Sequence, residues 1–307
     1  MVEAETGTHI WAERYDRLLD DIFAVQDELT MSVVGAIEPN LRKAEIERVR
    51  RKRPDNLHAY DLVLRALPLL YSAMPATMES AIPLLEKAIE IESGYARAHA
   101  DLAWCLHHRF SRGDHREEDR QAAIGHANAA IAGARDDATA LAIAAFVISL
   151  DARDNARALE LFDRALALSN SNIFALSCSA VILAWSGHTG LAIERASRAL
   201  RLSPFDPLND RSFNAISIAC FHERRFEDAA DAARRAIECN PGFSVPHLLL
   251  SAALLRLGRG AEARAVAQHG RKLQSNFTIR SFESTVGFAA DVFSGFAKAW
   301  ADAGLPE

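Results

Sequence analysis

Small and apolar residues recur along this chain at α-helical spacing, and one short pattern returns six times. An alanine is followed four residues later by an apolar or small residue, and three residues after that by alanine or glycine. Positions i, i+4 and i+7 share one face of a helix, so each copy predicts a helix that a neighbouring helix can approach closely. The copies are Ala81-Leu85-Ala88, Ala123-Ala127-Ala130, Ala158-Phe162-Ala165, Ala192-Ala196-Ala199, Ala229-Ala233-Ala236 and Ala263-Ala267-Gly270.

The copies follow one another at a nearly constant period. Their first alanines lie 42, 35, 34, 37 and 34 residues apart, and three of these five intervals are within one residue of 34. Turn residues such as Asp154-Asn155, Gly187-His188 and Gly258-Arg259-Gly260 precede several copies, and Ser203-Pro204 or Asn240-Pro241-Gly242 follow others. An apolar first helix is predicted before each of four copies, over Thr139–Leu150, Ile173–Trp185, Asp210–Phe221 and Ser244–Leu257.

These units predict an all-α, right-handed helical solenoid of about six helix pairs over residues 56–277. A lone pair cannot bury its apolar face, so neighbouring pairs must stack. A coiled coil needs uninterrupted heptads, which Pro and Gly breaks every 30–40 residues exclude. The first unit is the least regular, because Pro68, Pro75 and Pro83 are expected to interrupt it.

The period and the Ala158-x3-Phe162-x2-Ala165 pattern, with Pro204 and Pro241 closing later units, resemble the tetratricopeptide repeat over roughly residues 60–277. The Trp, Gly and Tyr of that repeat's first helix are mostly replaced here, for example by Ala142, Phe146 and Ser149. The resemblance implies a curved array that binds a partner on its concave face, and it leaves the partner's identity open.

Residues 1–55 lie outside the array, with a short strand predicted over His9–Tyr15 and helices from Asp20 and over Asn40–Arg53. The runs Trp11-Ala-Glu-Arg-Tyr-Asp16 and Asp21-Ile-Phe-Ala-Val-Gln-Asp27 resemble the end of the TolB-like domain in bacterial class III adenylate cyclase-type multidomain proteins. The resemblance implies that residues 1–55 are a remnant of that domain. It also implies a C-terminal regulatory part, with the catalytic residues for cyclic AMP synthesis lying upstream of this chain.

Composition narrows the classes of partner. Half of the residues are apolar, a quarter are charged and the net charge is −6, which disfavours disorder and disfavours nucleic acid as the partner. The longest apolar run, about Ala140 to Leu150, is too short to span a membrane. The chain opens on a polar, acidic stretch without a signal segment, so a cytoplasmic location is expected. Four scattered cysteines, Cys105, Cys178, Cys220 and Cys239, are interpreted as small buried hydrophobic residues.

The sequence contains little that supports a catalytic function. The sequence has no GxSxG, P-loop, GxGxxG or HExxH motif, so we predict no enzymatic activity, no cofactor and no metal site. The segment His107-His108-Arg-Phe-Ser-Arg-Gly-Asp114-His115 contains metal-ligand residue types, but we interpret it as a solvated loop between helices. The basic run from Arg42 to Arg53 is interleaved with Glu45 and Glu47, which is typical of a solvated helix face.

The concave face is the remaining candidate site. The repeat register places seven residues there, although each of them is also suited to the core between repeats: Trp104, Phe174, Val181, Trp185, Asn214, Ile218 and Phe221. Such an apolar groove favours an apolar segment or helix of a protein or peptide. Residues 278–307, rich in Phe and including Trp300, are predicted to be capping helices of the array, and a homodimer contact through them stays open.

Overall fold

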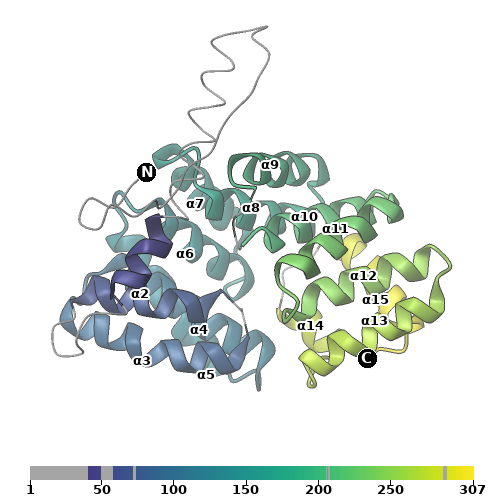
Figure 1. Ribbon diagram of the computed structural model, residues 1–307, viewed down its shortest axis with the longest axis horizontal. Coiled ribbons are helices and arrows are strands. Elements are labelled where there is room, and N and C mark those ends of the chain that lie inside the picture. The colour runs from purple at the N-terminus through teal and green to yellow at the C-terminus, as the bar shows by residue number, and fades with distance from the viewer. Residues whose placement is uncertain (1–40, 50–57, 72–73, 205, 207, 286–288) are drawn as a thin grey trace, which may run out of the picture.

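The computed structural model describes residues 41–49, 58–71, 74–204, 206, 208–285 and 289–307 (Figure 1). The predicted strand His9–Tyr15 and the helix from Asp20 lie outside these residues. Residues 41–49 are helical, and the buried Ile46 and Val49 pack against Leu64 and Leu67 of the first repeat. The described part of the predicted helix Asn40–Arg53 is therefore attached to the array by an apolar contact.

Twelve of the described helices form six packed pairs. The pairs are α2 (Ala59–Leu70) with α3 (Pro75–Ile91), α4 (Ala96–Arg112) with α5 (Glu117–Gly133), α6 (Ala138–Leu150) with α7 (Asn155–Leu168), α8 (Ile173–Trp185) with α9 (Thr189–Leu202), α10 (Asp210–His222) with α11 (Phe226–Cys239), and α12 (Ser244–Arg256) with α13 (Gly260–Leu273). The predicted solenoid of helix pairs is confirmed, and the four predicted first helices agree with α6, α8, α10 and α12 to within one residue at each end.

Small side chains set the distance between the two helices of a pair. Ala123, Ala127 and Ala130 of α5 are fully buried, as are the corresponding alanines of the other second helices. At the one copy that ends in glycine, a Cβ on Gly270 would lie 3.0 Å from the Cβ of His247 on α12. The recurring pattern therefore has a steric cause, since a larger residue would push the paired helices apart.

Turn residues place the two helices of each pair. At the turn that Asp154-Asn155 predicted, the carboxylate of Asp154 accepts a hydrogen bond from the backbone N–H of Arg157 at 3.0 Å and caps α7. Gly187 and Gly258, at the corresponding turns of later pairs, have φ values of 81° and 77°. Arg224 occupies the same turn between α10 and α11 with φ 62°, in the left-handed region that favours glycine.

Two sequence predictions about local features were wrong. Pro68 and Pro83 lie inside α2 and α3, which continue through them because each helix keeps a buried apolar face against its neighbours. Cys105, Cys178 and Cys220 are buried, as predicted, but Cys239 is exposed because it is the last residue of α11, past the face that packs against the array.

Successive first helices of the array contact one another, as expected for the inner side of a curved stack. The C-terminal helices α14 (Ile279–Thr285) and α15 (Ala290–Asp302) fold back onto this side. The Trp300 indole N–H of α15 donates a 2.8 Å hydrogen bond to the carbonyl of Leu248 on α12. The Phe296 ring stacks on Phe221 of α10 at 4.0 Å. The segment therefore covers part of the inner face instead of continuing the stack beyond α13.

Candidate functional site

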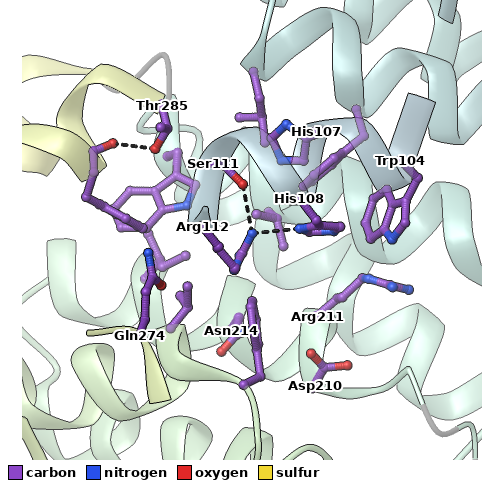
Figure 2. Close-up of a pocket in the computed structure, with 18 of the residues that line it drawn as sticks. Trp104, His107, His108, Ser111, Arg112, Asp210, Arg211, Asn214, Gln274 and Thr285 are labelled. Carbon is purple, nitrogen blue, oxygen red and sulfur yellow. Dashed lines mark hydrogen bonds between the residues drawn. The ribbon is translucent and has the colours of Figure 1, made fainter. Parts of the chain in front are cut away.

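A cavity of about 80 Å³ lies on the inner face, between α4, α6, α8, α10 and the C-terminal segment (Figure 2). This volume has room for several water molecules or a small chemical group. Its lining combines aromatic rings with buried polar and charged side chains: Tyr71, Trp104, His107, His108, Ser111, Arg112, Phe146, Leu150, Val181, Trp185, Asp210, Arg211, Asn214, Ile218, Phe243, Val245, Gln274, Phe282 and Thr285.

Five of the seven predicted groove residues line this one cavity, namely Trp104, Val181, Trp185, Asn214 and Ile218. The sixth, Phe174, lies beside Trp104 at a ring-centroid distance of 5.4 Å and is only partly buried. The seventh, Phe221, is covered by the Phe296 ring of α15. Their predicted role in partner binding stays a prediction.

The segment around His107 and His108 is not the solvated loop that we expected. Helix α4 continues to Arg112, and both histidine side chains are buried. The Nδ1 atom of His107 lies 2.8 Å from a carboxylate oxygen of Asp151, at the end of α6. In the part of the chain that the structure describes, no group of three or more His, Cys, Asp or Glu side chains is arranged to hold a metal ion.

Hydrogen bonding fixes the tautomer of His108. The Nη1 atom of Arg112 lies 2.6 Å from His108 Nδ1 and donates a second hydrogen bond to Ser111 Oγ at 3.0 Å (Figure 2). A guanidinium has donors only, so Nδ1 accepts and the proton of the neutral ring is on Nε2. Burial, reinforced by Arg112, holds the pKa of His108 well below its usual value. His108 therefore presents a neutral ring with an N–H donor at Nε2.

Arg211, at the start of α10, lies between two aromatic rings. Its Cζ is 4.8 Å from the Trp104 ring centroid and 4.6 Å from that of Phe174, and the residue is only 8% exposed. Such cation–π contacts stabilise a guanidinium most strongly where water is excluded. The stacking fixes Arg211 at the border of the cavity without using its hydrogen-bond donors.

Burial also shifts the pKa values of charged groups that line the cavity. It raises the pKa of Asp210 from 3.8 to about 6, an effect that nearby Arg211 opposes. It lowers the pKa of Arg112 to about 10, an effect that Asp210 opposes. The lining therefore contains two guanidinium groups and one carboxyl group, so basic side chains outnumber acidic ones at the cavity.

Except for Asn214, the polar residues of the cavity were missed by the sequence analysis, although helical spacing contains the signal. His108 and Arg112 follow Trp104 by four and eight residues, and Asp210 precedes Asn214 by four, so these residues share faces with predicted groove residues. Treating the segment after Trp104 as a loop removed His108 and Arg112 from the inner face.

No family model matches this chain. One curated relative, named Putative adenylate cyclase 3, of Rhizobium meliloti (strain 1021), is 41% identical over 103 residues. The match covers 34% of this chain and 18% of the relative, so this chain corresponds to less than a fifth of that protein.

Solved structures resemble a larger part of the chain. The human IFIT1 dimer with m7Gppp-AAAA has a TM-score of 0.57 at 17% identity and covers 79% of this chain and 59% of its own. The Cut9 complex with Hcn1, an APC/C hetero-tetramer, has a TM-score of 0.58 at 13% identity. The match covers 88% of this chain and 47% of the Cut9–Hcn1 chain. At such identities the likeness concerns the fold alone. The chain therefore has the tetratricopeptide-type helical-repeat fold that its period and its Ala158-Phe162-Ala165 pattern predicted.

Proposed function

We propose that this chain is a non-catalytic binding module that holds a partner protein or peptide on the inner face of its repeats. The observation that carries the proposal is the convergence of five groove residues, predicted from register alone, on one cavity between α4, α8 and α10. Concave sites at which apolar walls surround a few polar groups are typical binding sites. No helix in the described part of the chain is long and apolar enough to cross a membrane.

The C-terminal segment supports an apolar helix as the partner's binding element. Helix α15 places Phe296 against Trp185 and Phe221, at ring-centroid distances of 5.2 Å and 4.0 Å. The inner face thus accommodates an aromatic-bearing helix of this same chain. A partner helix with similarly spaced aromatic residues would find the same kind of surface on the neighbouring first helices.

Site-directed capture tests this proposal. Val181 is half-buried and lines the cavity, so Val181→Arg places a charge on the inner face. Leu191 on α9 is 41% exposed and does not line the cavity, so Leu191→Arg is the matched control. We expect a partner identified by mass spectrometry to be captured by wild type and Leu191→Arg, and lost with Val181→Arg. Equal capture by all three proteins would refute the inner face as the binding surface.

The relative from Rhizobium meliloti favours a second candidate, a regulatory part of an adenylate cyclase-type protein. The absence of catalytic motifs from the sequence supports a role in which cyclic AMP synthesis belongs to another domain. Purified chain incubated with ATP and Mg²⁺ or Mn²⁺ is expected to form no cyclic AMP. Formation above a heat-denatured control would overturn the non-catalytic proposal.

A further inference from the structure

Three nitrogen–hydrogen donors of residues that line the cavity lack an acceptor. Arg112 Nε, Arg211 Nη1 and His108 Nε2 are buried and have no hydrogen-bond partner within the described part of the chain. A buried donor left unpaired lowers the stability of the folded state, and more so when the donor is charged. Native proteins rarely leave such groups unpaired without a reason, and three such donors around one cavity indicate an acceptor that the described residues do not supply.

The donors come from two helices that face each other across the cavity. His108 and Arg112 lie on α4, and Arg211 lies on α10 below Trp104 (Figure 2). Among the described residues, no ion pair joins Asp210 to either arginine, so neither guanidinium is neutralised by a direct contact. The Asn214 amide, whose Oδ1 also lacks a partner, can turn its donor or its acceptor end towards a ligand.

Aromatic and aliphatic side chains form another part of the lining. Trp104 and Phe146 lie 5.1 Å apart on one side, and Ile218 and Val181 contribute aliphatic surface. A cavity that combines buried donors and guanidinium groups with adjacent aromatic rings fits a ligand with an acidic oxygen group and a flat body.

We propose that this cavity binds a small organic anion, whose carboxylate or phosphate oxygens accept hydrogen bonds from His108, Arg112 and Arg211 while its apolar body lies against Trp104. The site is in the same cavity as the proposed partner surface and adds a small-molecule ligand to it. A bound anion would satisfy the unpaired donors and bridge α4 to α10, so it would stiffen the middle of the inner face.

Probe molecules of one shape and different charge test the proposal. Benzoate and phenyl phosphate carry the acidic group on a flat ring, benzamide is the neutral counterpart of benzoate, and benzamidine is the cationic one. Calorimetric titration of the purified full chain is expected to detect benzoate or phenyl phosphate, at least tenfold tighter than benzamide or benzamidine. The tighter of the two anions identifies the acidic group.

Variants connect binding to the named donors. Arg211→Met and Arg112→Met are each expected to weaken binding of the preferred anion at least tenfold. The control is Arg235→Met, because the Arg235 guanidinium also stacks on a ring, 4.3 Å from the Phe213 centroid, but does not line the cavity. Far-UV circular dichroism checks that each variant is folded. If one of the two cavity variants does not fold, the other alone completes the test.

Three results would overturn the proposal: no binding of either anion, equal binding of benzoate and benzamide, or unchanged affinity in a folded cavity variant. Because the probes and the chain are pure, the outcome does not depend on whether a partner protein is found.

Discussion

The docking of α15 onto the inner face can be tested by replacing one buried ring. Phe296 is fully buried, stacks on Phe221 at 4.0 Å with an interplanar angle of 21°, and lies 5.5 Å from the Trp300 ring. Phe→Ala changes in close-packed cores cost roughly 3–5 kcal/mol, since both the buried surface and its contacts are lost. We expect Phe296→Ala to lower the free energy of unfolding by roughly 3–5 kcal/mol.

Urea unfolding measures this loss. With a denaturant slope of about 2.5 kcal/mol per M, the expected loss lowers the unfolding midpoint by roughly 1–2 M. Two buried tryptophans, Trp185 and Trp300, report on the same contact, so their fluorescence should shift to longer wavelength in this transition. Lys298→Ala is the control, because Lys298 is exposed on the same helix. A midpoint shift no larger than that of Lys298→Ala would refute the docking of α15 against α10.

Three further predictions concern single positions. The raised pKa of Asp210 means that the folded state binds this proton more tightly than the unfolded state, so the free energy of unfolding of wild type should fall as pH rises from about 4 through 6. Asp210→Asn lacks this titration, so its free energy of unfolding should exceed that of wild type by about 2–3 kcal/mol at pH 7.5. Denaturation at each pH measures the difference. Arg224→Gly should raise the free energy of unfolding by about 0.5–1 kcal/mol, because glycine adopts the left-handed φ of this position without strain. Arg224→Ala should not raise it. Ala196→Leu should destabilise by about 1–3 kcal/mol in urea unfolding, because Ala196 is fully buried, and the exposed Glu194→Leu should not.

The array of helix pairs could be predicted because the residues that define each pair act within that pair. The small residue required at positions such as Ala199 and Gly270 repeats in every pair, and turn residues such as Asp154 act on the adjacent helix. Each unit therefore repeats the same evidence for the fold, and helix bounds followed to within one residue in four cases. The register also placed five of seven predicted residues at one cavity, since residues on one helix face stay together when neighbouring pairs stack.

The C-terminal segment was harder to place because its contacts are distant in sequence. Trp300 hydrogen-bonds a carbonyl 52 residues earlier, and the Arg153 guanidinium donates to the Ser284 carbonyl 131 residues later. No periodic pattern contains such pairings. The sequence predicted capping helices over residues 278–307, but contacts with distant residues such as Trp185, Phe221 and Leu248 determine where they pack.

The charged lining of the cavity was missed for a different reason, which also bears on what it does. Charged residues usually lie at the surface, yet Arg211 and Asp210 are buried without a direct ion pair between them among the described residues. Removing buried charges in favour of neutral groups of similar volume is often neutral or stabilising by about 1–4 kcal/mol. If the two charges serve a ligand and not the fold, the double variant Asp210→Asn, Arg211→Met should melt no lower than wild type in the absence of anions. Met at position 211 keeps the contact with Trp104 and Phe174 through its sulfur. A clear fall in melting temperature would instead assign the Arg211 stack to holding α10 against α4.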